Sequence, residues 1–193
     1  MFFELSIWRD QNEMSDRLNI ETRLALLGIG DDTVHNARLF YPTLYAALDR
    51  IVEKFYNHLL SFPDARQILA PMDVQTRLAP RQKAHWEKLF SCRIDERYVA
   101  EALLVGKIHF QSKVPPYLYL AGYNFFHCQI IKLATEKYDR LTGLPEILAG
   151  TSRLITLDMD LALSAYTREF WQMSDLASGE AAETTEPSEH VYV

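Results

Sequence analysis

Apolar residues recur at helical spacing along almost the whole of this 193-residue chain. The clearest case is the stretch 43–60, where apolar side chains follow in steps of three or four residues, the period of one helix face: Leu44, Leu48, Ile51, Phe55 and Leu59. The chain holds only seven glycines, and no stretch of useful length alternates between apolar and polar residues as a half-buried strand does. The pattern therefore predicts an all-α fold, and the length suits one domain.

Caps and helix breakers divide this pattern into separate helices. Gly28 and Gly30 end the first helix, Asp31 and Asp32 can cap a short second one, and Pro42 suits the first turn of the third. We expect helices over residues 14–27, 31–40, 43–60, 78–90, 96–109, 117–141 and 146–173, with a corner at 62–64, a short apolar piece at 68–69 and a loop from 71.

The composition changes at Ser174 to mostly Asp, Ser, Gly, Glu, Ala, Thr and Pro. Such a segment buries too little apolar surface to offset the entropy that it would lose on ordering. We therefore expect a folded domain over residues 1–173. A disordered acidic tail, or the start of a linker to a second domain, is expected over residues 174–193.

Charge and composition speak against several classes of function. The net charge of −6 and the scattered basic residues argue against a nucleic-acid partner. No segment reaches the roughly 20 apolar residues that cross a bilayer, and the N-terminus lacks the basic region and cleavage site of a signal peptide. Cys92 and Cys128 lie far apart, which fits reduced thiols better than a disulfide framework. We expect a cytoplasmic protein that binds no membrane.

The common catalytic and metal-binding motifs are absent from the sequence. It contains no HExxH, no zinc-finger spacing, no ExxH pair, no GxSxG, no phosphate-binding loop and no GxGxxG. Asp158 and Asp160 on the last helix are expected to form a solvated pair. They lie beside a predicted core stripe, which consists of Leu148, Ile155, Met159, Leu163 and Tyr166. We therefore expect no enzymatic activity in this chain.

His109 is the residue best placed to bind a cofactor. It falls in the last turn of its predicted helix, just before a Pro115-Pro116 pair that breaks this helix and starts the next. Haem iron needs one axial ligand, commonly a neutral imidazole, and an apolar pocket. Val105 and Ala102, one and two turns earlier, would let a flat porphyrin approach the helix. Spacing alone also fits a core histidine and ordinary helix packing, so both interpretations stay open at this point.

Several phrases of the sequence, taken together, resemble one known family. They are Phe55-Tyr56 in the third helix, His85-Trp86 in the next long helix, and His109 followed by Pro115-Pro116, Tyr119 and Gly122-Tyr123. The step of 53 residues from Tyr56 to His109 is typical of this family. In this order and spacing, over about residues 18–171, the chain resembles the sensor globins, that is, the globin domain of globin-coupled sensors and their single-domain relatives.

The resemblance implies a globin fold with an extra N-terminal helix and without the usual D helix. It implies haem b with His109 as the proximal ligand of the iron, Tyr56 as the distal tyrosine and Leu78 on the distal wall. Tyr119 and Tyr123, which belong to the matching phrases, are assigned to the same pocket. Members commonly form homodimers through their last two long helices, and they pass the oxygen signal to a cyclase, kinase or chemotaxis domain.

Physical chemistry fits these assignments. The second ring N–H of His109 needs an acceptor to fix the ring, and the carbonyl of Val105, four residues earlier, is one candidate. The hydroxyl of Tyr56 can donate a hydrogen bond to O2, which draws negative charge onto its terminal oxygen, and this bond could contribute about 1–3 kcal/mol in a dry pocket. CO would gain less. The alternative is a Tyr56 that packs in the core with its hydroxyl at the surface.

For two residues of the helix 78–90, Arg81 and His85, the sequence allows two different roles on the distal side of the haem. Arg81 stands where the family usually has a small or hydroxyl residue that faces the ligand, and an arginine cannot be buried uncharged. Our hypothesis is that Arg81 pairs with a haem propionate, and the alternative is a rotated helix with Gln82 facing the ligand. His85, seven residues after Leu78, could reach the iron as a sixth ligand. We favour a packing role for it, because a sensor needs an open position.

The resemblance and the assigned site residues predict that the protein is a haem-based gas sensor that binds O2, and also CO and NO. Its ligand state would pass through a helical dimer interface to an output domain or a partner protein. One alternative is an oxygen-binding globin, or one that converts nitric oxide to nitrate, without a signalling role. A haem-free globin-like interaction module is a third possibility, and His109 argues against it.

Overall fold

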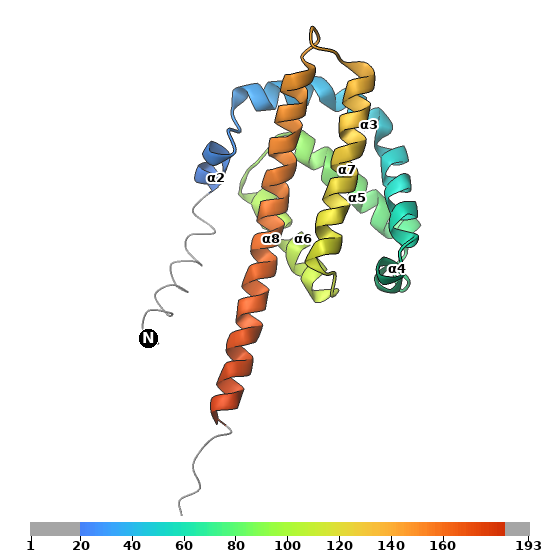
Figure 1. Cartoon of the computed structure of the whole chain (residues 1–193). Coiled ribbons are helices and arrows are strands. Elements are labelled where there is room, and N and C mark those ends of the chain that lie inside the picture. Colours follow the sequence, from blue (N-terminus) through green and yellow to red (C-terminus); the bar gives the residue numbers. More distant parts are fainter. Residues whose placement is uncertain (1–19, 184–193) are drawn as a thin grey trace, which may run out of the picture.

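The computed structural model describes the backbone of residues 20–183 and the side chains up to residue 168. All regular elements in this range are helices, which confirms the predicted all-α fold (Figure 1). They are α2 (Ile20–Leu26), α3 (Asp31–Leu60), α4 (Pro63–Leu69), the π-helix η1 (Val74–Leu78), α5 (Ala79–Phe90), α6 (Glu96–Gln111), α7 (Pro116–Lys137) and α8 (Leu144–Glu183). The predicted first helix began at residue 14, and its first six residues lie outside the described range.

α3 is one helix where the sequence predicted two. The expected break before Pro42 is wrong, because the helix runs through this proline without interruption. A proline removes one backbone N–H and crowds the preceding turn, so a helix that retains one usually bends, and Figure 1 shows α3 bent. Phe40 and Leu44, on either side of Pro42, are both fully buried in the core. Their burial outweighs the local cost of the proline.

The corner between α6 and α7 forms as the sequence predicts. The carboxylate of Asp95 accepts a hydrogen bond from the backbone N–H of Tyr98 (2.9 Å) and so starts α6. α6 ends at Gln111, which places His109 in its last turn. α7 starts at Pro116, where the missing N–H of a proline leaves no helical bond unmade.

α7 ends at Lys137, four residues before the predicted end near Leu141. The carboxylate of Asp139 accepts hydrogen bonds from the backbone N–H groups of Leu141 and Thr142, both at 2.9 Å. Such local bonds offer the backbone an alternative to the helix. They hold a turn in this position and explain the earlier end.

α8 begins at Leu144 and continues to Glu183, past the Ser174 at which disorder was expected. The alanine, leucine and glutamate residues in the stretch 174–183 favour a helix in spite of its low content of apolar side chains. The rest of the predicted tail, residues 184–193, lies outside the described range. None of the helices within residues 20–183 is long and apolar enough to cross a membrane.

The connection from α3 to α5 contains more structure than predicted. The short helix α4 stands where a corner and an apolar piece were expected, and the five-residue π-helix η1 precedes α5. The carboxylate of Asp73 accepts a hydrogen bond from the backbone N–H of Thr76 (2.9 Å) and starts η1. No further α-helix lies in the described stretch 70–78, in line with the expected absence of a D helix.

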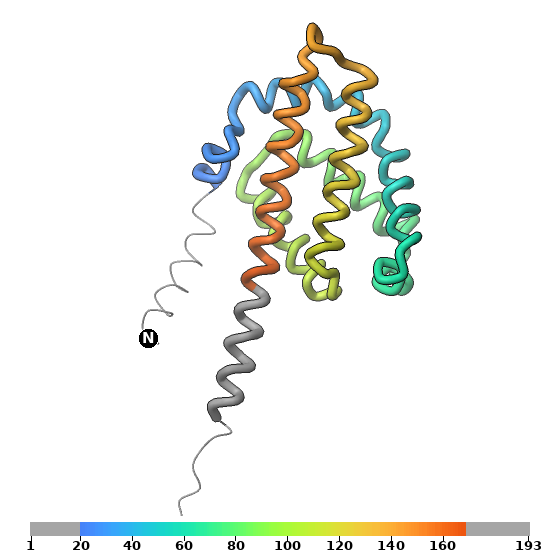
Figure 2. Tube along the Cα trace, viewed as in Figure 1, coloured from blue at the N-terminus to red at the C-terminus, as the bar shows by residue number. Residues whose placement is uncertain are grey.

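The helix α3 and two further pairs of helices enclose the core. Figure 1 shows α7 and α8 side by side, with α5 and α6 behind them, and Figure 2 traces the same path as a tube. Trp86 of α5 stacks on Phe126 of α7, with ring centroids 4.5 Å apart. α6 touches α8 directly at Gly106, where an added Cβ would lie 2.2 Å from the carbonyl oxygen of Ala162. This contact holds the helix that carries His109 against α8.

Candidate functional site

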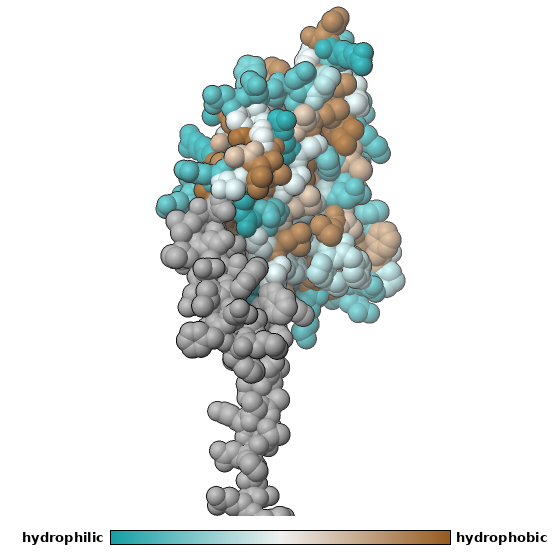
Figure 3. All heavy atoms as spheres, turned by 60° about the vertical axis from the view of Figure 1, so that its left-hand side comes forward, coloured by the Kyte–Doolittle hydropathy of each residue, from teal (hydrophilic) through white to brown (hydrophobic). Residues whose placement is uncertain are grey.

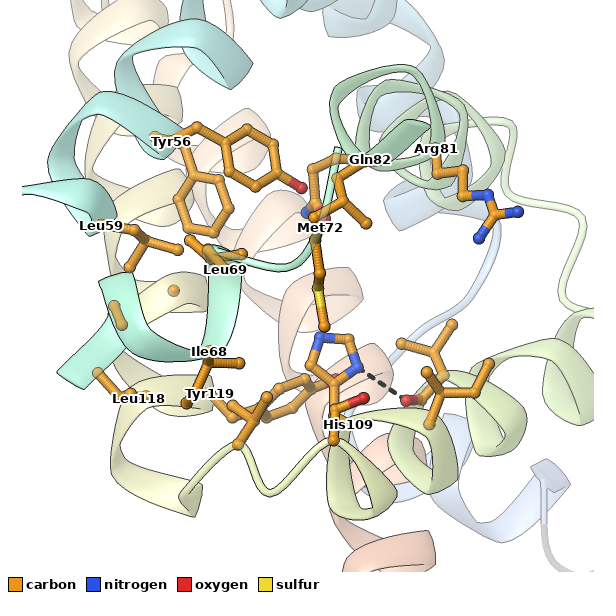
Figure 4. A pocket seen from close by; sticks show the side chains of 18 of the residues that line it. Tyr56, Leu59, Ile68, Leu69, Met72, Arg81, Gln82, His109, Leu118 and Tyr119 are labelled. Atoms are coloured by element: carbon orange, nitrogen blue, oxygen red, sulfur yellow. Dashed lines mark hydrogen bonds between the residues drawn. The ribbon is translucent and has the colours of Figure 1, made fainter. Parts of the chain in front are cut away.

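A cavity of about 460 Å³ lies between α3, α4, α5, α6 and α7. Its volume falls in the range of small-ligand and cofactor pockets, roughly 300–1,000 Å³. All eight residues that the sequence predicted for the site line this cavity: Tyr56, Leu78, Arg81, Gln82, Val105, His109, Tyr119 and Tyr123. Sequence reasoning missed the apolar lining residues Ile68, Leu69, Met72 and Leu118, because three of them belong to α4 and the loop after it, whose position only the fold decides (Figure 4).

His109 lies on one wall of the cavity, and its ring is oriented by its own helix (Figure 4). The Nδ1–H of His109 donates a hydrogen bond to the carbonyl oxygen of Val105 at 2.8 Å, the partner that the sequence predicted. Because Nδ1 carries the hydrogen, Nε2 keeps a lone pair on the side that faces the cavity. The ring of Tyr119 packs against the imidazole edge to face, with centroids 5.1 Å apart.

The protonation state of His109 suits metal binding. Burial lowers the pKa of this imidazole below its usual 6.5, although the hydrogen bond to Val105 acts in the opposite direction. The ring is therefore neutral at neutral pH. A neutral imidazole with one free nitrogen is the form in which histidine binds a metal ion.

Tyr56 lies on the opposite wall and points its hydroxyl into the cavity (Figure 4). The side chain is 8% exposed and packs against Phe55, with ring centroids 5.0 Å apart. Burial raises the pKa of Tyr56 to about 12, so the hydroxyl keeps its proton. It makes no hydrogen bond to any described residue of the chain. The hydroxyl of Tyr56 therefore does not lie at the surface, which was the alternative, and it is free to donate a hydrogen bond to a ligand.

α5 presents Gln82, and not Arg81, to the hydroxyl of Tyr56. Gln82 is half-buried and lies next to this hydroxyl in Figure 4, whereas the guanidinium of Arg81 points away from both groups. Arg81 is exposed at the rim of the cavity, where its charge stays hydrated. Leu78, at the end of η1, is half-buried and lines the same side. The arginine at this position is therefore accommodated without burial of its charge.

Asp158 is fully buried, and the predicted solvated pair with Asp160 is wrong. Asp158 lies on the same face of α8 as Leu154 and Leu161, which are also buried. This spacing of a carboxylate within a helical apolar stripe was the signal in the sequence that it belongs to the core. Asp160, two residues further on, is partly exposed and pairs with Arg23.

Asp158 is paired with His85, whose Nε2 lies 2.7 Å from Oδ2 of the carboxylate. Burial favours a neutral imidazole, but the nearby carboxylate outweighs burial and raises the pKa of His85 above its usual 6.5. Burial likewise opposes ionisation of Asp158, yet the charge of His85 and its hydrogen bonds hold the pKa of Asp158 below its usual 3.8. Nε2 of His85 is thus engaged within the fold, as a packing role requires.

These features fit a haem group. The walls of the cavity are mainly apolar, one wall carries a neutral imidazole with a free nitrogen, and the other carries a protonated phenol. Haem iron needs one such axial ligand and a pocket that controls its other face. An all-α fold with a histidine placed in this way, at a helix corner beside such a cavity, is the arrangement found in globins.

The family is shown by the sequence itself. A sequence model of the Protoglobin family matches residues 16–172, and the chain belongs to this family. The match agrees with the resemblance to sensor globins, and it supports haem b as the cofactor. A curated relative is the heme-based aerotactic transducer HemAT of Halobacterium salinarum, which is 24% identical over 178 residues. The alignment covers 84% of this chain and 36% of the relative, so the chain spans about a third of that protein's length.

Solved structures show the same fold. The globin domain of a globin-coupled sensor from Geobacter sulfurreducens superimposes with a TM-score of 0.72 at 15% identity, over 76% of this chain and 97% of that domain. The ferric globin domain of DosC from E. coli gives a TM-score of 0.63 at 16% identity, over 77% of this chain and 97% of that domain. The predicted globin fold is thereby confirmed.

Proposed function

We propose that this chain is a haem-based oxygen sensor, in which His109 is the proximal ligand of the haem iron. The observation that carries the proposal is the hydrogen bond from Nδ1 of His109 to Val105, because it leaves Nε2 free on the cavity side. The family and the name of the HemAT relative, a transducer, support a sensing role. In this proposal the chain itself senses and does not catalyse.

A haem held by His109 would supply ferrous iron, which binds the diatomic gases O2, CO and NO. On the cavity wall opposite His109, the hydroxyl of Tyr56 would donate a hydrogen bond to such a ligand. Because O2 would carry more negative charge on its outer atom than CO would, this hydrogen bond would favour O2, by about 1–3 kcal/mol. Gln82 adds a second polar group beside Tyr56, and the apolar side chains of Leu69 and Leu78 limit the access of water.

In this proposal, the structural change that ligand binding causes is transmitted through α7 and α8, which form a homodimer interface. Leu120 and Ile131 of α7 are 43% and 37% exposed, and their spacing of eleven residues, three helical turns, places them on one face. Figure 3 shows that apolar side chains reach the surface in several groups among polar ones. A two-fold dimer would cover such a face by pairing it with its copy. α8 would then lead to an output domain or a partner protein, of the cyclase, kinase or chemotaxis kind.

The decisive experiment is the absorption spectrum of the purified protein and of His109→Ala. We expect the wild-type protein to show a Soret band and His109→Ala to lose it or to bind haem only weakly. His127→Ala is the matched control. His127 of α7 forms a hydrogen bond with Ser152 of α8 and lies outside the cavity lining. An unchanged Soret band in His109→Ala would refute the assignment of the proximal ligand.

A globin that detoxifies nitric oxide would use the same cavity. Sustained consumption of nitric oxide with an electron donor would favour that function over sensing. A sensor should bind the gas reversibly and turn over little.

A further inference from the structure

Asp158 joins three helices that surround the cavity. Its fully buried carboxylate on α8 accepts hydrogen bonds from the Nε2–H of His85 on α5 (2.7 Å), the hydroxyl of Tyr98 on α6 (2.5 Å) and the hydroxyl of Tyr123 on α7 (2.6 Å). Three donors compensate for the desolvation of a buried charge, which would otherwise be costly. One side chain of α8 thus fixes the positions of α5, α6 and α7 relative to α8.

The directions of these hydrogen bonds follow from the groups themselves. An ionised carboxylate can only accept, so the one proton of the Tyr123 hydroxyl is donated to Asp158. The hydroxyl of Tyr119, 3.0 Å from that of Tyr123, must then donate its own proton to the Tyr123 oxygen. The Tyr119 ring in turn packs against the imidazole of His109. One ring contact and two hydrogen bonds therefore connect His109 to α8.

The opposite wall of the cavity is tied to the same carboxylate. His85 lies on α5, three residues after Gln82, which faces Tyr56 (Figure 4). A displacement of α5 by a ligand beside Tyr56 would therefore change the geometry at Asp158. Packed interiors transmit such shifts because few voids are available to absorb them.

We propose that Asp158 is a positioning residue, which sets the placement of His109 and of α5 against α8 and thereby couples the gas ligand to α8. The inference rests on the proposed function. Asp158 does not touch the ligand and acts through Tyr123 and Tyr119 on one wall and through His85 on the other. Because coupling between two sites is reciprocal, a substitution that disturbs the α8 end of this network should also alter ligand binding in the cavity.

The test compares Asp158→Asn, Tyr123→Phe and the double variant with the control Thr151→Val, all as ferrous haem protein. Asp158→Asn keeps the volume but replaces one accepting oxygen by a donor. Thr151 is also buried on α8, and its hydroxyl has no hydrogen-bond partner among the described residues, so Thr151→Val removes a polar atom outside the network. The readouts are the iron–histidine stretching frequency by resonance Raman, the O2 dissociation rate, and amide hydrogen exchange along α5 and α8.

We expect Asp158→Asn and Tyr123→Phe to shift the stretching frequency and to change the O2 dissociation rate by about two- to tenfold, the equivalent of one net hydrogen bond. Exchange along α5 should become faster, and Thr151→Val should change none of these quantities. The double variant should show no larger frequency shift than Asp158→Asn alone, because both substitutions interrupt the same path.

Two other outcomes separate the inference from the function on which it rests. Folded variants with an unchanged frequency and an unchanged O2 rate overturn the coupling role and leave oxygen sensing intact. A wild-type protein without an iron–histidine band overturns the proposed function, and the inference with it. If Asp158→Asn does not fold, Tyr123→Phe and Tyr98→Phe test the same network with one hydroxyl removed at a time.

Discussion

The Cα of Gly106 lies so close to α8 that a Cβ at this position would approach the carbonyl oxygen of Ala162 to 2.2 Å. This contact occurs three residues before His109, so the backbone that carries the proposed iron ligand rests directly on the backbone of α8. Any side chain at residue 106 would have to separate the two helices. The position of His109 relative to α8 therefore depends on the absence of a side chain at this one residue.

Gly106→Ala should destabilise the protein, because the added methyl group overpacks a backbone contact that cannot yield. We expect a loss of about 1–3 kcal/mol in the free energy of unfolding, measured by urea denaturation. Gly150→Ala is the matched control within α8: its nearest contact would be an ordinary 3.6 Å, and alanine is the better helix former, by up to about 1 kcal/mol. Equal stability of the two variants would contradict the close approach of α6 and α8.

Tyr56→Phe should release O2 faster while the CO dissociation rate changes little. The substitution removes only the hydroxyl, and the loss of about 1–3 kcal/mol corresponds to roughly 5- to 150-fold in the O2 dissociation rate. Stopped-flow and flash-photolysis kinetics measure both rates. Tyr45→Phe serves as the control, because Tyr45 is exposed on α3 outside the cavity lining. Equal effects on O2 and CO would indicate a steric role for Tyr56 in place of a hydrogen bond.

Arg81→Ala should increase the rate of haem loss if the exposed guanidinium pairs with a propionate at the rim of the cavity. The effect should be modest, about two- to fivefold, because exposed ion pairs contribute at most about 1 kcal/mol. Transfer of haem to an apo-globin acceptor measures this rate. Arg97→Ala removes an exposed arginine of α6 that lies outside the cavity lining and is the control. Unchanged haem loss and unchanged ligand rates in Arg81→Ala would count against the propionate pair.

The His85–Asp158 pair should make stability depend on pH in two directions. The pKa of Asp158 is lowered, so its contribution is present above its usual 3.8 and is lost as the pH falls through the lower folded value. The pKa of His85 is raised, so its contribution is complete below its usual 6.5 and is lost as the pH rises through the higher folded value. The pair therefore stabilises most between about pH 4 and 6.5.

Urea denaturation across this range, compared with His85→Gln, tests the assignment. The variant should lose the decline in unfolding free energy that the wild-type protein shows above about pH 6.5. Parallel pH profiles for the two proteins would mean that His85 is neutral in the folded state.

Charge on the exposed face of α7 should prevent dimer formation. Leu120→Glu and Ile131→Glu each place a carboxylate on the proposed two-fold interface, where it would face its own copy. We expect the wild-type protein to be a dimer by light scattering and each variant to shift towards monomer. Leu26→Glu is the control, since Leu26 is 82% exposed on α2. If the wild-type protein is monomeric, the signal cannot pass through a homodimer interface, and this part of the proposal is wrong.

Local features of the fold could be predicted from the sequence because they depend on residues a few positions apart. The cap at Asp95, the last turn of α6 at His109 and the start of α7 at Pro116 are of this kind. The bond from His109 to Val105 is also local, since its partners lie one helical turn apart. The early end of α7 shows the limit of such reasoning, because the side chain of Asp139 competes for the same backbone groups.

Pro42 and Asp158 were misjudged for one shared reason. A proline commonly marks a helix boundary and an aspartate commonly faces water, but both rules describe a residue without its tertiary partners. Burial of Phe40 and Leu44 keeps α3 continuous, and three donors from other helices keep Asp158 ionised in the core. Such partners are distant in sequence and cannot be read from spacing.

The sequence by itself determined that the chain is all-α, that it resembles the sensor globins, and that His109 ends a helix at a sharp corner. The tertiary structure decided which side chains share the cavity, that Gln82 and not Arg81 lies beside Tyr56, and that one buried carboxylate links α5, α6 and α7 to α8. The physical reason is that helical periodicity reports which face of a helix is apolar. The rotation of each helix, and the residue it meets there, depend on close packing against the others.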